Sequence, residues 1–144
     1  MSAHRQSDAA LRAPWRVNAS YGFNDAEFLD YEESPGVNRR GNTPVFAPRQ
    51  TFNLWTGYDW SNGLGLNVGA RFLGRTFAAN GNTFEVDGYG VLNLAARYRR
   101  GRLEYQLNIN NLTDTEYFVP HQDYLQVYPG NPVNVLATVR VRMN

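Results

Sequence analysis

The sequence predicts an all-β fold, an antiparallel meander of about six transmembrane strands. Three observations lead to this prediction. Apolar and polar residues alternate strictly in several segments, the connections between those segments are alternately short and long, and aromatic residues gather near both ends of the apolar positions. Strict alternation indicates a strand with one apolar and one polar face. Each segment is also close to the length, about 9–11 residues, that a tilted strand needs to cross a bilayer.

The first three predicted strands occupy residues 15–24, 51–60 and 64–73. In each of them Trp, Phe, Tyr, Leu and Val side chains alternate with a mixture of Arg, Asn, Ser, Gly and Thr. The second and third strands are separated only by Ser61, Asn62 and Gly63. An Asn-Gly pair supplies the positive φ of a tight hairpin, so these two strands are expected to be neighbours.

The last three predicted strands occupy residues 91–98, 103–110 and 133–143. The alternation is unbroken from Leu103 to Asn110, and the fourth and fifth strands are joined by a second tight turn at Arg100 and Gly101. No stretch shows a helical period of 3.6 residues that would cover a sheet face, although residues 7–13 are long enough for a turn or two of helix.

The long connections predict which end of the sheet carries the loops. Residues 25–48, about a dozen residues around 78–84, and residues 119–132 are polar and alternate with the short turns, so all three fall at one end. Short turns at one end and long loops at the other are typical of outer-membrane barrels. Two aromatic belts at the headgroup levels of a bilayer agree with this. They consist of Trp15, Trp60, Tyr98 and Tyr105 near the short turns, and Phe23, Phe72, Tyr117 and Phe118 toward the loops.

The polar face is expected to line a wet lumen, because it carries Arg, Asn, Gly and Ser in place of the Lys, Glu and Thr that are usual on an exposed strand face. We expect its arginines either to form ion pairs with Glu104, Asp59 and other acidic groups or to be a solvated lining. The predicted lumen-facing residues are Arg16, Asn53, Arg71, Asn93, Arg97, Glu104, Gln106, Asn108, Asn110, Arg140 and Arg142.

The composition of the 144 residues argues against other classes of function. The net charge of +1 gives no reason to expect nucleic-acid binding. Cysteine is absent and His4 and His121 are the only histidines, with no His-Glu-x-x-His motif. The glycines of residues 63–69 do not have dinucleotide-binding spacing. We therefore expect no enzyme activity, no metal and no cofactor. A soluble β-rich binding module stays open as an alternative, because alternation alone does not show which face meets water.

Residues 91–118, followed by residues 128–132, resemble the carboxy-terminal end of TonB-dependent outer-membrane receptors. The most specific part is Asn110-Asn111-Leu112-x-Asp114-x-x-Tyr117. Residues 41–44 and 47–56 resemble the approach to a descending strand in the ferric-siderophore members, and residues 74–77 and 82–89 continue that likeness. The resemblance covers roughly residues 15–143, which is nearly the whole chain.

The resemblance implies a barrel of about 22 strands closed by an amino-terminal plug, in which this chain supplies the carboxy-terminal part. It also implies outer-membrane lipid as surroundings and a ferric siderophore as ligand, imported when the TonB system acts on the plug. We expect residues 15–144 to belong to the barrel and residues 1–14 to be non-homologous or disordered. Neither plug nor signal peptide is visible, so the chain is interpreted as a fragment that does not transport alone.

The other alternative within membranes is a small independent barrel. One departure from the family concerns the carboxy terminus, where members commonly end on an aromatic residue. This chain has Met143 and Asn144 there. The departure puts efficient barrel assembly in doubt.

The last long loop contains the candidate ligand-binding residues, because binding residues favour loops on a rigid scaffold. Aromatic faces and hydrogen-bonding groups suit a siderophore, and they are supplied there by His121, Gln122, Tyr124, Gln126 and Tyr128. Asn110, Asn111 and Asp114 are better interpreted as the ending of a strand than as ligand contacts, since Asn and Asp bond nearby backbone groups and tolerate turn conformations.

Overall fold

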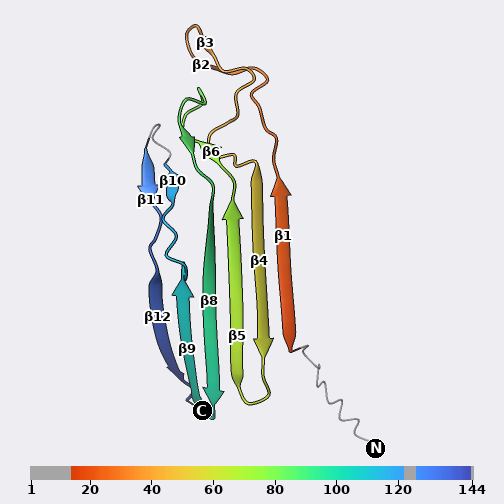
Figure 1. The fold of residues 1–144 in the computed structure, drawn as a ribbon, viewed down its shortest axis with the longest axis vertical. Coiled ribbons are helices and arrows are strands. Elements are labelled where there is room, and N and C mark those ends of the chain that lie inside the picture. Colours follow the sequence, from red (N-terminus) through yellow and green to blue (C-terminus); the bar gives the residue numbers. More distant parts are fainter. Residues whose placement is uncertain (1–13, 122–125, 144) are drawn as a thin grey trace, which may run out of the picture.

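The computed structural model describes residues 14–121 and 126–143, and its main body is one antiparallel sheet of six strands (Figure 1). The sheet is a meander, because each strand pairs with the long strand that follows it in the chain. This confirms the predicted fold class. In spatial order the strands are β1 (Trp15–Phe23), β4 (Gln50–Asp59), β5 (Leu64–Leu73), β8 (Tyr89–Arg100), β9 (Leu103–Asn110) and β12 (Asn134–Val141).

Each long connection contains a short two-stranded hairpin, and all three hairpins lie at the same end of the sheet (Figure 1). The sequence predicts the position of these loops but not the hairpins, because strands of two or three residues are too short to show a period. The hairpins are β2 (Glu32–Ser34) with β3 (Val37–Asn38), β6 (Thr76–Phe77) with β7 (Glu85–Val86), and β10 (Phe118–Pro120) with β11 (Val127–Pro129).

The short turns at the opposite end depend on two glycines in the left-handed region. Gly63 has φ 89° and Gly101 has φ 59°. In the first turn the Trp60 amide donates to the Leu64 carbonyl at 2.8 Å, and the Gly63 amide donates to the Trp60 carbonyl at 3.2 Å. Asn62 is not in the left-handed region, so the Asn-Gly pair uses only its glycine for this purpose.

Strand register keeps the two faces of the sheet distinct. Asn53 pairs with Ser20 on one side and Arg71 on the other, while Leu54 pairs with Ala19 and Ala70. Because neighbouring positions in register point to the same face, polar side chains share one face and apolar side chains share the other. The apolar face has no charged residue between its two ends. Only Arg100, at the short-turn end of β8, interrupts its apolar character there.

The apolar face is not covered by any other part of the described chain. Val17 is 57% exposed, Phe72 44% and Val139 60%. Within the described residues, the buried hydrophobic side chains are Ala78 and Val86, and both belong to the loop between β5 and β8. The sheet therefore has no core of its own, and its apolar face needs an apolar surrounding. None of the described residues forms a helix long and apolar enough to cross a membrane.

Candidate functional site: an arginine-rich polar face and the outer loops

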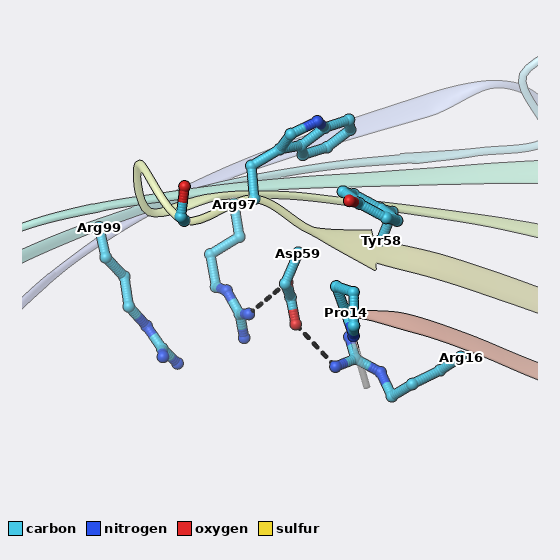
Figure 2. Close-up of a pocket in the computed structure, with 8 residues that line it drawn as sticks. Pro14, Arg16, Tyr58, Asp59, Arg97 and Arg99 are labelled. Carbon is cyan, nitrogen blue, oxygen red and sulfur yellow. Dashed lines mark hydrogen bonds and ion pairs between the residues drawn. The ribbon is translucent and has the colours of Figure 1, made fainter. Parts of the chain in front are cut away.

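At the short-turn end of the polar face, two arginines share the carboxylate of Asp59. Arg16 Nη1 lies 2.6 Å from Oδ2 and Arg97 Nη2 lies 2.8 Å from Oδ1. Figure 2 shows both guanidinium groups directed at this carboxylate, with Arg99 extended on the same side. These residues border a cavity of about 750 Å³. Register explains the cluster, because Asp59 lies opposite Gly65 and Gly65 lies opposite Arg97, so no side chain stands between them.

A second cluster surrounds Glu104, which is only 5% exposed. Arg99 on β8 bonds one carboxylate oxygen, and on the other side Arg140 Nη1 lies 3.0 Å and Arg142 Nη2 lies 3.7 Å from the carboxylate. Glu104 stands on β9, between the strand of Arg99 and the strand that places Arg140 and Arg142. Three guanidinium groups therefore share one carboxylate, and the short-turn end of the polar face carries more positive than negative charge.

The other predicted lumen residues lie on this same face in smaller polar contacts. Asn53 donates to the Ser20 hydroxyl at 3.4 Å, Gln106 donates to Asn108 at 3.1 Å, and Asn110 donates to Asn134 at 2.9 Å. Arg71 forms no ion pair with a described residue. The structure thus brings the predicted residues onto one face, and all of them except Arg71 belong either to the two ion-pair clusters or to a row of amides.

Two features of the polar face were missed from sequence. Arg99 lies just beyond the predicted strand at 91–98, and extending that strand by one residue would have placed Arg99 on the same face as Arg97. The second feature is Trp55, whose ring lies against Gly69 on the polar face. A Cβ added to Gly69 would lie 2.8 Å from the ring. A glycine directly opposite a tryptophan on the neighbouring strand indicates this packing. The pair can be recognised only once the strand register is known.

Asn111 directly follows β9 and connects it to the last loop. It adopts φ 50° and is 4% exposed. Its Nδ2 donates to the carbonyls of Thr115 at 2.9 Å and Asn131 at 3.0 Å, and its Oδ1 accepts from the Thr115 amide at 2.9 Å. Asp114, also in the left-handed region at φ 49°, accepts a hydrogen bond from the Val133 amide at 2.8 Å. Both side chains are hydrogen-bonded to backbone groups, which supports the interpretation of the motif as a strand ending.

The predicted ligand-binding loop is described in part. The rings of His121 and Tyr128 meet edge to face with centroids 4.7 Å apart, and the His121 amide donates to the Gln126 carbonyl at 2.9 Å. Tyr128 is 51% exposed, so its ring has surface available for a ligand. Gln122 and Tyr124 lie outside the described residues. His121, Gln126 and Tyr128 are therefore brought together at the loop end of the sheet.

Tyr117 holds this loop against β8 through close packing with Gly130. Its ring stacks on Tyr89 with centroids 4.1 Å apart, and the Gly130 amide donates to its carbonyl at 2.7 Å. A Cβ on Gly130 would collide with the Tyr117 ring. Any residue larger than glycine would therefore clash at this position.

We predict that Gly130→Ala lowers the free energy of unfolding by about 1–3 kcal/mol, because the added methyl forces the Tyr117 ring off Tyr89. Urea unfolding of the micelle-bound chain, followed by tyrosine fluorescence, measures this. Gly36→Ala is not a suitable control because Gly36 has a positive φ of 81°. Gly90→Ala is suitable, because its nearest contacts are 3.8 Å or more away. Equal losses in the two variants would contradict the prediction.

The loop after β1 and the loop after β5 are bonded to each other. Glu33 Oε2 lies 2.7 Å from Arg39 Nη2, and its other oxygen accepts from Asn80 Nδ2 at 3.0 Å. Asn82 accepts from the Thr43 amide at 2.8 Å and donates to the Thr43 carbonyl at 2.7 Å. The β2–β3 hairpin is therefore attached to residues 78–83, and the two outer loops form one unit.

Acid is expected to weaken this attachment. Hydrogen bonds from Arg39 and then Asn80 hold the pKa of Glu33 below its usual value of 4.5. A carboxyl with a lowered folded-state pKa stabilises the fold fully above its ordinary pKa, and this contribution is lost as the pH falls through the lowered value. We predict that carbon NMR of labelled glutamate shows Glu33 titrating below pH 4.5. In Arg39→Gln its midpoint should move upward, and an unchanged midpoint would contradict the assigned cause.

The geometry defines a class of protein. A six-stranded meander with one lipid-compatible face, one charged face, tight turns at one end and structured loops at the other is a segment of the wall of an outer-membrane β-barrel. Residues 7–112 match the sequence profile of the family described as TonB dependent receptor-like, beta-barrel, and the chain belongs to this family.

Curated relatives agree with the family. The chain is 30% identical, over 95% of its length, to the ferrichrome outer membrane transporter/phage receptor of Escherichia coli strain K12, and it covers 19% of that protein. It is 31% identical, over 85% of its length, to the ferrioxamine receptor of Yersinia enterocolitica, of which it covers 18%. These relatives are named as transporters and receptors rather than enzymes. The chain spans about a fifth of their length.

Solved structures show the same fold. The siderophore receptor PiuA from Acinetobacter baumannii superposes with a TM-score of 0.77 at 27% identity, over 90% of this chain and 20% of that one. The ferric preacinetobactin receptor BauA from the same organism gives a TM-score of 0.78 at 22% identity, over 88% of this chain and 19% of the receptor. These comparisons confirm that the meander is the kind of sheet found in receptor barrels.

Proposed function

We propose that this chain is the carboxy-terminal wall segment of an outer-membrane receptor that imports a ferric siderophore with the help of the TonB system. The observation that carries the proposal is the division of the sheet into an apolar face without charge at mid-strand and a polar face with two arginine clusters. In a receptor barrel the first faces lipid and the second lines the lumen. The relatives named as ferrichrome and ferrioxamine receptors support a ferric siderophore as the ligand class.

The two ends of the sheet are proposed to have different roles. The outer loops, including His121, Gln126 and Tyr128, contact the ligand, because they are structured, partly exposed and aromatic. The arginine clusters at the short-turn end face the plug and the water of the lumen. Because the chain supplies six strands of a larger barrel, it does not transport alone.

Two experiments test the proposal. Washing the host membranes at alkaline pH should leave the chain in the outer-membrane fraction, since its apolar face is held by lipid. Interrupting the coding region for residues 15–143 should abolish uptake of at least one radioactive ferric siderophore under iron limitation, while uptake of the others continues. Release of the chain by the alkaline wash, or unchanged uptake across a panel of hydroxamate, catecholate and carboxylate siderophores, would contradict it.

A further inference from the structure

The short-turn end of the sheet carries an excess of positive charge. Its described residues include two carboxylates, Asp59 and Glu104, and seven arginines, which are Arg16, Arg97, Arg99, Arg100, Arg102, Arg140 and Arg142. Five of these arginines form ion pairs with the two carboxylates on the polar face. Arg100 and Arg102 are exposed, and neither forms an ion pair or a side-chain hydrogen bond with a residue that the structure describes. Their charges are therefore not compensated within the sheet.

Arg100 lies on the apolar face of the sheet, away from both arginine clusters. The preceding residue, Arg99, bonds Glu104 on the polar face, and successive residues of a strand point to opposite faces. In register Arg100 pairs with Leu103, which is 37% exposed. Arg102 follows in the tight turn between β8 and β9, at the end of the sheet opposite the loop hairpins (Figure 1). The Arg100 guanidinium is thus available to a counter-ion outside the barrel wall.

A row of aromatic side chains crosses the apolar face beside these arginines. Tyr98 pairs in register with Leu64 and with Tyr105, and the Leu64 carbonyl accepts a hydrogen bond from the Trp60 amide at 2.8 Å. Trp60, Tyr98 and Tyr105 are 42%, 39% and 43% exposed. Tyr and Trp rings favour the headgroup level of a bilayer. Arg100 lies two residues beyond this row, about 7 Å farther toward the turn, which places it at the level of the lipid phosphates.

We propose that Arg100 and Arg102 bind the phosphate of an anionic phospholipid in the leaflet that surrounds the short turns. The inference rests on the proposed receptor function, which places the apolar face in lipid, and it adds a specific lipid partner at the rim of that face. A guanidinium matches a phosphate with two parallel hydrogen bonds. Arginines next to a membrane surface also attract anionic lipids electrostatically.

The surroundings of the two arginines favour a lipid over a free anion, and an anionic lipid over a zwitterionic one. On the far side of the aromatic row the apolar face continues with exposed side chains such as Leu107, which is 39% exposed. An acyl chain gains contact with this surface, whereas inorganic phosphate does not. A zwitterionic headgroup brings its own cation close to two guanidinium groups, and like charges at that separation repel.

Native mass spectrometry of the whole chain, released from detergent micelles that contain equal amounts of phosphatidylglycerol and phosphatidylcholine, tests the proposal. The ratio of the two bound lipids measures the preference for an anionic headgroup. We expect the original chain to prefer phosphatidylglycerol. Arg100→Gln and Arg102→Gln should each lower the ratio about fivefold, because one arginine at an anionic membrane surface contributes about that factor. Both positions are exposed, so the fold should be retained.

Arg71→Gln is the matched control. It removes the same charge from the polar face, where Arg71 pairs in register with Asn53 and forms no ion pair with a described residue. The control should leave the ratio unchanged, and inorganic phosphate should not displace the bound lipid.

The proposal is overturned if the original chain binds both lipids equally, if the two rim variants keep its preference, or if Arg71→Gln lowers the preference as much as they do. Displacement of the lipid by inorganic phosphate would also overturn it, by indicating a site for the free anion. All of these outcomes leave retention in alkali-washed membranes and siderophore uptake unaffected. Failure of this inference is therefore distinguishable from failure of the proposed function.

Discussion

Replacing Asn111 by alanine is expected to lower the free energy of unfolding by about 3–4 kcal/mol. The side chain makes three hydrogen bonds to the backbone of Thr115 and Asn131, and the residue is 4% exposed. Alanine leaves these backbone groups without their partner. It also keeps a side chain at φ 50°, where asparagine is better tolerated than alanine. Urea unfolding of the chain in lipid vesicles, followed by tryptophan fluorescence, measures the loss.

Two further variants separate the causes of this loss. Asn111→Gly relieves the backbone strain but does not restore the lost hydrogen bonds. Its free energy of unfolding should therefore be about 1 kcal/mol higher than that of Asn111→Ala. Asn110→Ala is the matched control from the neighbouring position. It removes one exposed contact with Asn134, at 2.9 Å, and should cost less than about 1 kcal/mol. A similar loss at positions 110 and 111 would refute the assigned role of Asn111 as the anchor of the last loop.

The sheet was predictable because apolar and polar residues alternate regularly along its strands. In Leu103–Asn110 every second residue is apolar, and this pattern alone specifies a two-faced strand. Tight turns at Gly63 and Gly101 then fix which strands are neighbours. The loop hairpins were not predictable in this way. Pairs such as Thr76–Phe77 with Glu85–Val86 contain too few residues for a period, and their pairing depends on contacts with other loops.

The candidate site was predictable in composition but not in pairing. Alternation places Arg16, Arg97 and Arg140 on the polar face, but the choice of partner depends on register across neighbouring strands. Arg97 reaches Asp59 because Gly65 stands between them without a side chain, and the sequence does not state that these three positions are aligned.

The assignment of the two faces has a direct physical consequence at mid-strand. Val68 lies on the apolar face at the middle of β5, opposite Thr56 and Leu94, and Asn67 beside it lies on the polar face, opposite Gly57 and Ala95. If the apolar face contacts lipid, Val68→Arg places a guanidinium near the bilayer midplane. The cost of a lipid-facing arginine at that depth is about 2–4 kcal/mol.

Asn67→Arg is the matched control, because it adds the same side chain one residue away on the opposite face. It should change the free energy of folding into lipid vesicles by less than about 1 kcal/mol, since a guanidinium on that face remains hydrated. The prediction is therefore a difference between adjacent positions rather than a loss at one of them. Equal costs at 67 and 68 would show that both faces meet the same medium, and a larger cost at 67 would reverse the assignment of lipid and lumen. Either result would remove the basis for placing the arginine clusters inside a receptor barrel.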